Sequence, residues 1–202
     1  MSKQTLVTLD LEGVLVPEIW IAVAEKTGIE ALRRTTRDEP DYDRLMQGRL
    51  DILAEHGLGL PDIQEVIATL SPLPGAAAFL EQLRARTQVI ILSDTFEEFA
   101  QPLMRQLGWP SIFCHRLLCD PAGRLSGYRL RQPNQKQAAV AAFKGLNYKV
   151  IAAGDSFNDT TMLAEADVGF FFHAPENIRA QFPQFRAFDE YADLRCSIEE
   201  QL

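Results

Sequence analysis

The sequence predicts an α/β protein: a Rossmann-like, mainly parallel sheet flanked by helices, with a small helical cap inserted after the first strand. Four apolar, β-branched runs are typical of central strands covered on both faces, at 5–10, 88–94, 148–155 and 167–172. Helical patterns separate these runs, as in parallel sheets with crossover helices. Residues 17–71 contain helical patterns only, a stretch too long for a simple strand-to-helix connection.

The first strand, "TLVTLD", is followed by three helical patterns: "PEIWIAVAEKTG", "DYDRLMQGRLDILAEHG" and "LPDIQEVIATL". Residues that end or begin helices punctuate them, namely Pro17, Gly28, Pro40, Gly57 and Pro61. We therefore expect two domains. Residues 17–71 form a helical cap domain, and residues 1–16 with 72–202 form the α/β core domain.

Beyond the cap, helical patterns alternate with the remaining strands at 75–87, 97–108, 134–146 and 159–166. Pro102 lies inside the second of these and predicts a late helix start or a kink. The segment "RLLCDPAGRLSGYRL" (116–130) carries turn residues between two short runs and predicts a hairpin. The final residues, 174–202, are typical of a mixture of short helix and loop.

Composition limits the classes of function. The chain has 202 residues, of which 47% are hydrophobic and 24% charged, and a net charge of −8. Such an acidic chain without a basic stripe is a poor candidate for binding nucleic acid or an anionic membrane. No cysteine pair has metal or redox spacing, "MSKQ" leads straight into a strand, and no run has the ~20 apolar residues of a membrane span. We expect a cytoplasmic monomer or homodimer with small-molecule partners.

Polar residues follow three of the predicted strands. Asp10 and Glu12 follow the first, and the others are Ser93, Asp94, Thr95, Asp155, Ser156, Asn158 and Asp159. Ligands of open α/β sheets bind outside the carboxyl ends of the strands, so these side chains should share one rim. Carboxylates clustered away from water need a cation. Hard oxygen ligands of this kind favour Mg²⁺.

In chain order, "DLEGV", "LSDT", Lys136 and "GDSFND" resemble the four motifs of the haloacid dehalogenase superfamily of phosphotransferases. The helical segment resembles that superfamily's small cap, and the cap with "RLDIL" is similar to the phosphoserine phosphatases. With "DLEGVLVPEIW", "TTRDEPDYD" and "FHAPEN", the whole chain resembles the bifunctional phosphoserine phosphatase/homoserine phosphotransferase branch. The resemblance covers essentially all of the chain.

The resemblance implies a role for each polar residue. Asp10 would be the nucleophile that forms an aspartyl-phosphate. Asp10, the main-chain carbonyl of Glu12 and Asp155 would hold Mg²⁺. Glu12 stands where most phosphatases of the superfamily have a second Asp, which acts as general acid for the leaving group and then as general base for the acceptor.

The remaining roles concern the phosphoryl group and the substrate. The resemblance implies that Ser93 and Lys136 bind phosphoryl oxygens and that Lys136 also restrains Asp10. Asp94 and Asn158 are expected to bind substrate. Asn158 and Asp159 would also orient the metal and Lys136 through contacts with the groups that bind directly.

Two cap residues are candidates for binding the α-amino-acid part of a substrate. Arg49 could bind a substrate carboxylate through two hydrogen bonds, and Glu18 could bind its ammonium group. Each candidate also has a simpler interpretation: a helix-capping residue for Asp10 and Ser93, a turn residue for Glu12, a helix-start acid for Glu18 and Asp159, and a surface residue for Arg49 and Lys136.

The predicted function is a Mg²⁺-dependent phosphoserine phosphatase that works through phospho-Asp10 and also transfers the phosphoryl group to homoserine. One alternative is a phosphatase or phosphomutase of the same superfamily that acts on another small phosphate ester. The other is a non-catalytic protein that binds a phosphometabolite. The implied partners are phosphoserine and homoserine.

Overall fold

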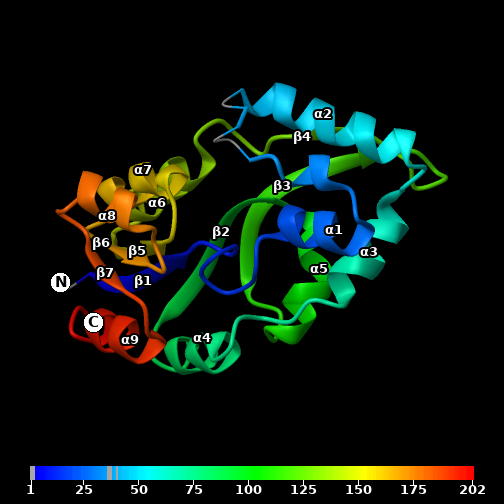
Figure 1. Cartoon of the computed structure of the whole chain (residues 1–202). Coiled ribbons are helices and arrows are strands. Elements are labelled where there is room, and N and C mark those ends of the chain that lie inside the picture. The colour runs from blue at the N-terminus through cyan, green and yellow to red at the C-terminus, as the bar shows by residue number, and fades with distance from the viewer. Residues whose placement is uncertain (1–2, 36–37, 40) are drawn as a thin grey trace.

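The computed structural model describes residues 3–35, 38–39 and 41–202, and places a seven-stranded sheet at the centre of the core (Figure 1). The strand order is β4-β3-β2-β1-β5-β6-β7. All neighbouring strands are parallel except β3 and β4. The strands are β1 (Gln4–Leu9), β2 (Gln88–Phe96), β3 (Ser111–Cys119), β4 (Leu125–Arg129), β5 (Tyr148–Gly154), β6 (Val168–Phe172) and β7 (Arg186–Phe188). The predicted α/β fold class is confirmed.

Helices cover both faces of the sheet. Helices α4 (Ala76–Arg84) and α9 (Tyr191–Glu199) pack together on one face. On the other face lie α6 (Gln135–Gly145), α7 (Thr160–Glu165) and α8 (Glu176–Gln181), while the short η2 (Phe157–Asp159) precedes α7. Successive residues of β1 enter different apolar clusters, Leu6 with α6 and Val7 with α4. A strand buried on both faces explains why β1 lacks the regular alternation of apolar and polar residues that a half-exposed strand shows.

The described residues of 17–71 form helices only: α1 (Ile19–Thr27), the 3-10 helix η1 (Glu30–Arg33), α2 (Tyr42–Glu55) and α3 (Leu60–Ala68). Helix α3 packs against α5 (Glu97–Gln106) of the core, and α2 packs against β4. Three residues of the "TTRDEPDYD" motif, Pro40 among them, lie outside the described residues. The first two residues of "MSKQ" also lie outside them. The division into cap and core domains stays a prediction.

Helix α5 begins at Glu97 and runs through Pro102, so of the two expected effects of this proline the late start is wrong, while the kink stays a prediction. A proline cannot donate to the carbonyl four residues earlier, here that of Glu98. The side chain of Gln64 on α3 donates to this carbonyl instead, at 2.7 Å. A hydrogen bond from the cap thus replaces the one that the proline removes.

The structure corrects three other boundaries. The predicted hairpin is present, but β3 begins at Ser111 and first pairs in parallel with β2. The tail contains a short strand, β7, that we expected to be helix or loop. Strand β2 extends to Phe96, two residues beyond the run expected at 88–94, and its pairing with β3 is interrupted between Leu92 and Phe96. Ser93 and Asp94 lie in this irregular stretch.

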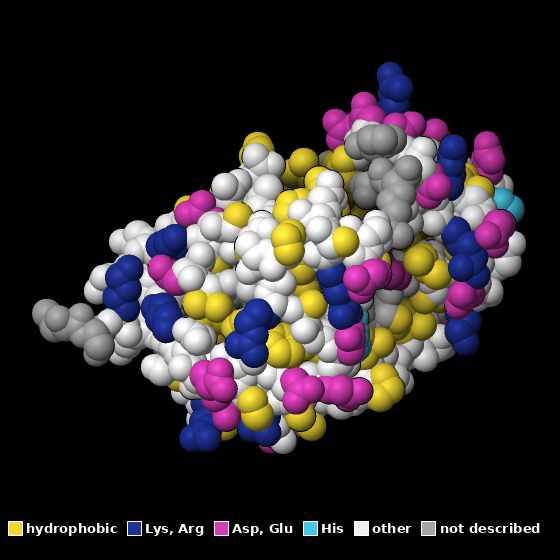
Figure 2. All heavy atoms as spheres, turned by 60° about the vertical axis from the view of Figure 1, so that its left-hand side comes forward, with side chains coloured by type: hydrophobic (Ala, Val, Ile, Leu, Met, Phe, Trp, Pro, Cys, Tyr) yellow, Lys and Arg dark blue, Asp and Glu magenta, His cyan; other side chains and the backbone are white. Residues whose placement is uncertain are grey.

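Figure 2 shows one face of the molecule, where basic and acidic side chains alternate without a continuous basic stripe. Within the described parts of the chain, no helix is long and apolar enough to cross a membrane. The cytoplasmic location and the oligomeric state stay predictions.

Candidate active site

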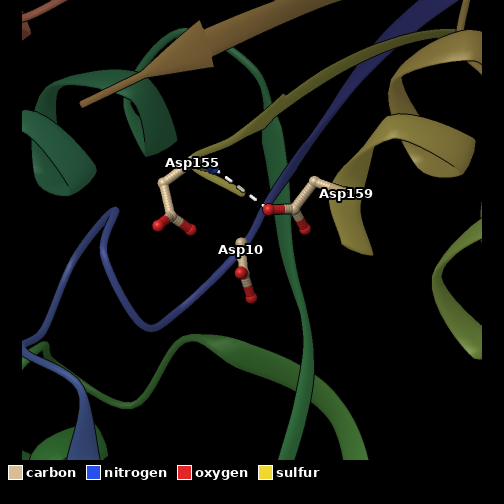
Figure 3. A group of neighbouring side chains, drawn as sticks. All are labelled: Asp10, Asp155 and Asp159. Carbon is tan, nitrogen blue, oxygen red and sulfur yellow. Dashed lines mark hydrogen bonds between the residues drawn. The ribbon is translucent and has the colours of Figure 1, made fainter. Parts of the chain in front are cut away.

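Three carboxylates meet at the carboxyl edge of the sheet (Figure 3). Asp10 directly follows β1, and its backbone N–H donates to Ala153 on β5 at 2.9 Å. Asp155 follows β5, and Asp159 ends η2. One carboxylate oxygen from each of the three lies within 4.8 Å of the others. Because parallel strands end at one edge, residues 145 positions apart in the chain become neighbours.

Lys136 supplies the cation of this cluster. Its Nζ lies 3.0 Å from Asp10 Oδ1, 2.8 Å from Asp159 Oδ1 and 3.7 Å from Asp94 Oδ2. Burial alone would lower the pKa of Lys136, but the charges of Asp10, Asp159 and Asp94 raise it well above its usual value. Lys136 is only 3% exposed, so its interpretation as a surface lysine is wrong.

Asp159 uses both of its oxygens for hydrogen bonds. Oδ1 accepts from Lys136, and Oδ2 accepts from the backbone N–H groups of Asp155 at 3.0 Å and Ser156 at 3.1 Å. The hydroxyl of Ser156 also donates to Oδ2 at 3.1 Å. These hydrogen bonds indicate that Asp159 orients Lys136 and the loop that carries Asp155.

The cluster fits a divalent cation. Burial and the charge of Asp159 raise the pKa of Asp10 well above its usual value, although Lys136 opposes them. Burial, Asp159 and Glu18 raise the pKa of Asp155 to about 7. One ammonium group therefore does not neutralise the carboxylates, whereas hard oxygen donors suit Mg²⁺. Asp10 and Asp155, with the main-chain carbonyl of Glu12, would hold such an ion.

Gly13 lets the chain after β1 pass directly against Asp155. Its φ is +75°, and a Cβ atom at this position would lie 2.4 Å from Asp155 Cγ. The position therefore requires glycine both for its backbone conformation and for space. This explains the glycine of the "DLEGV" motif.

Ser93 and Asp94 join the same site from β2. The Ser93 hydroxyl accepts from the backbone N–H of Thr95 at 3.2 Å and is almost fully buried. Asp94 Oδ2 accepts from Asn158 Nδ2 at 3.2 Å. Burial alone would raise the pKa of Asp94, but Lys136 and hydrogen-bond donors around it hold the pKa well below its usual range. Asp94 is thus an anion at the edge of the site.

Glu12 lies between the carboxylate cluster and the cap. Burial and the charge of Glu18 raise the pKa of Glu12 to about 8, while the backbone of Ile19 and the charge of Arg49 lower it. Its Oε1 is buried and, within the described part of the chain, has no hydrogen-bond partner. Burial therefore favours the protonated form of Glu12.

Arg49 is buried in the cap, so its interpretation as a surface arginine is wrong. Its guanidinium carbon lies 4.5 Å from the centre of the Trp20 ring, and Nη2 donates to the carbonyl of Arg34 at 2.7 Å. Its Nε has no hydrogen-bond partner among the residues described. Burial lowers the pKa of Arg49 to about 10, which leaves it charged at neutral pH.

Glu18, the weaker cap candidate, is exposed and occupies the N-cap position of α1 without a side-chain capping hydrogen bond. Its charge reaches both Glu12 and Asp155, which places it on the cap side of the site. The structure thus brings Asp10, Lys136 and the other core candidates into contact, whereas Glu18 and Arg49 approach them from the cap.

Sequence reasoning missed Gln135 and His115, which are 2% and 4% exposed and contact the Ser93–Asp94 segment. Gln135 directly precedes Lys136, and this adjacency was the one available signal. His115 lies on β3, 21 residues beyond Asp94, and nothing in its local sequence indicates the contact.

Comparisons with known proteins agree with this geometry. A family model described as a haloacid dehalogenase-like hydrolase matches residues 5–167. Phosphoserine phosphatase ThrH of Pseudomonas aeruginosa is 66% identical over 187 residues, which cover 93% of this chain and 91% of the relative. A phosphoserine phosphatase of Pseudomonas syringae pv. tomato is 64% identical over 187 residues, with 93% and 79% covered. A solved substrate-bound phosphoserine phosphatase complex shares the fold, with a TM-score of 0.76, 20% identity and 99% of both chains covered.

Proposed function

The chain belongs to the haloacid dehalogenase-like hydrolases, and from this premise we propose that it is a Mg²⁺-dependent phosphoserine phosphatase. It works through an aspartyl-phosphate on Asp10 and also transfers the phosphoryl group to homoserine. The observation that carries the proposal is the Lys136 ammonium 3.0 Å from Asp10 within a buried carboxylate cluster. The relatives named phosphoserine phosphatase support the choice of substrate.

In the first step, a carboxylate oxygen of Asp10 attacks the phosphorus of phosphoserine. The bond from phosphorus to the serine oxygen breaks, and its electron pair stays on that oxygen. Glu12, whose burial raises its pKa and favours the protonated form, gives its proton to the leaving oxygen. Lys136 and Ser93 bind the phosphoryl oxygens. Mg²⁺, when bound, supplies positive charge that neutralises the phosphate.

In the second step, Glu12 has become a carboxylate and acts as a base. It takes a proton from water or from the hydroxyl group of homoserine, and the oxygen of that molecule attacks phosphorus. The bond from phosphorus to Asp10 breaks, and the electron pair returns to the carboxylate. The product is inorganic phosphate or O-phosphohomoserine, according to the acceptor.

The test is the release of inorganic phosphate from phosphoserine by the full chain, with Mg²⁺ and with a chelator in its place. We expect release with Mg²⁺ and none with the chelator. Release from other small phosphate esters but not from phosphoserine would support the alternative substrate class. A chain that binds phosphoserine and releases no phosphate would be the non-catalytic alternative.

Arg49→Ala is expected to raise KM for phosphoserine more than tenfold beyond any change for phosphoethanolamine, which lacks the carboxylate. A charge-assisted hydrogen bond to a buried group contributes about 1.5–3 kcal/mol, which corresponds to at least about a tenfold change. Steady-state kinetics with both esters measures the difference. Arg44→Ala is the matched control, because Arg44 lies on the same helix with 77% of its side chain exposed. Equal effects of Arg49→Ala on the KM of the two esters would show that Arg49 does not bind the substrate carboxylate.

Phosphoserine and homoserine together are expected to yield O-phosphohomoserine without ATP. Homoserine has one methylene more than serine, and one methylene in a pocket changes binding by only about 1–3 kcal/mol. Glu12→Asp should alter the ratio of transfer to hydrolysis more than total phosphoenzyme formation, because it moves the base away from the acceptor. Phosphorus NMR of the products measures this ratio, with propanol as the control acceptor that lacks the amino-acid groups. Inorganic phosphate alone at saturating homoserine would leave a plain phosphatase.

A further inference from the structure

Gln135 begins helix α6 and is buried directly behind the phosphoryl site. Its Nε2 donates to the main-chain carbonyl of Ser93 at 2.7 Å and to Asp94 Oδ1 at 3.1 Å. Its Oε1 accepts from Arg131 Nη2 at 2.8 Å. Nε2 faces two acceptors and Oε1 faces a donor, so the side-chain amide of Gln135 fits in one orientation only.

Asp94 connects Gln135 to the catalytic cluster. Oδ1 receives the Gln135 hydrogen bond and lies 3.6 Å from His115 Nε2. The other ring nitrogen of His115 accepts the backbone N–H of Arg131 at 3.1 Å, so the proton of a neutral ring is on Nε2 and faces Asp94. Oδ2 accepts from Asn158 and lies 3.7 Å from Lys136 Nζ. Both oxygens of Asp94 therefore already have partners in the protein.

We propose that Gln135 is a positioning residue of the phosphoryl site. It ties Ser93 and Asp94 to the first turn of α6, which also carries Lys136, and so fixes the Ser93 hydroxyl and the Lys136 ammonium relative to each other. The two groups lie on different elements, 43 residues apart in the chain. Donors that are fixed before the reaction stabilise a developing phosphoryl charge without reorganisation. The inference rests on the proposed phosphatase function.

Gln135→Glu is the sharpest test. The substitution keeps the size of the side chain and the oxygen that accepts from Arg131. It replaces the Nε2 donor with a second oxygen, which then faces the Ser93 carbonyl and Asp94 Oδ1. We expect kcat for phosphoserine and for p-nitrophenyl phosphate to fall about tenfold or more, the factor that matches loss of a charge-assisted hydrogen bond. The inhibition constant of orthovanadate should rise by a similar factor. This constant does not depend on the fraction of folded protein, so a purely structural role would leave it unchanged.

The reciprocal double variant Gln135→Glu/Asp94→Asn restores a donor–acceptor pair on the Asp94 side, with the roles exchanged, while the Ser93 carbonyl still faces an oxygen. We expect it to bind orthovanadate at least about threefold more tightly than Gln135→Glu, since residues in contact are coupled by this amount or more. Gln135→Met, of similar size and without the amide, is the second variant if Gln135→Glu does not fold, and a smaller loss of orthovanadate affinity is expected. Gln137→Glu is the matched control: it makes the same change on the same helix, where the side chain contacts Glu165 rather than the site.

The outcomes separate this inference from the proposed function. A parent protein that releases no phosphate from phosphoserine would contradict the proposed function, while the orthovanadate comparison would still test Gln135. If the parent is active and Gln135→Glu keeps kcat and the inhibition constant within about twofold, the positioning role is overturned. A double variant no better than Gln135→Glu would overturn it as well.

Discussion

Asp10→Asn is expected to lower kcat for phosphoserine by about a thousandfold or more, equivalent to at least about 4 kcal/mol of activation free energy. The amide has almost the size of the carboxylate, but its oxygen is neutral and cannot form a stable acyl-phosphate with the incoming phosphoryl group. The hydrogen bond from the Leu11 N–H to Oδ1, at 2.7 Å, can be kept by the amide oxygen. The loss should therefore concern the chemistry and not the local fold.

The stability of Asp10→Asn should equal or exceed that of the parent when both are studied with a chelator. The raised pKa of Asp10 means that its charged form is disfavoured in the folded protein, so the charge lowers stability at neutral pH. Thermal unfolding of both proteins measures this, and single-turnover phosphate release measures the chemistry. Asp51→Asn, at an exposed position of α2, is the control. Activity of Asp10→Asn within about tenfold of the parent would exclude Asp10 as the nucleophile.

Lys136→Met is expected to abolish measurable turnover and to lower the free energy of unfolding by about 3–5 kcal/mol in the presence of a chelator. The methionine fills most of the space of the lysine but leaves the buried carboxylates of Asp10 and Asp159 without their common cation. Removal of one partner from a buried ion pair costs this much because the remaining charge stays desolvated.

Urea unfolding measures the stability of Lys136→Met, with Lys144→Met as the control. Lys144 lies in the last turn of the same helix, where its ammonium donates to the carbonyl of Glu165, and it is partly exposed. Mg²⁺ should restore part of the stability lost in Lys136→Met, since a bound cation compensates the same carboxylates. A variant with the parental stability and turnover would show that Lys136 is not the cation of the site.

The core of the site could be predicted because its residues follow from order and topology. Asp10 and Asp155 end adjacent parallel strands, and any sheet with this order brings them to one edge. The role of Gln135 could not be predicted, because it depends on Ser93, which meets it only after β2 and α6 have packed. A glutamine at the start of a helix has the same local sequence signal whether it faces water or the main-chain carbonyl of Ser93.

The strands that sequence reasoning missed have a similar explanation. Strand β7 has three residues, "RAF", of which two are only half-buried, too few for a periodic pattern. Strand β3 changes partners along its length, from a parallel pairing with β2 to an antiparallel one with β4. The burial of β3 therefore changes along its length. Only the part that pairs with β4 is next to turn residues that can be recognised in the sequence.

The bond from Gln64 to the Glu98 carbonyl also bears on how firmly the helical segment 17–71 is held to α5. A hydrogen bond of this kind contributes only about 0.5–1.5 kcal/mol net, because water can take the place of the donor when the partners separate. Because Pro102 has no N–H, the residue four positions after Glu98 does not compete for this carbonyl, and the acceptor stays available to Gln64. For the proposed cap, such a contact would cost little to break on opening and could re-form on closure.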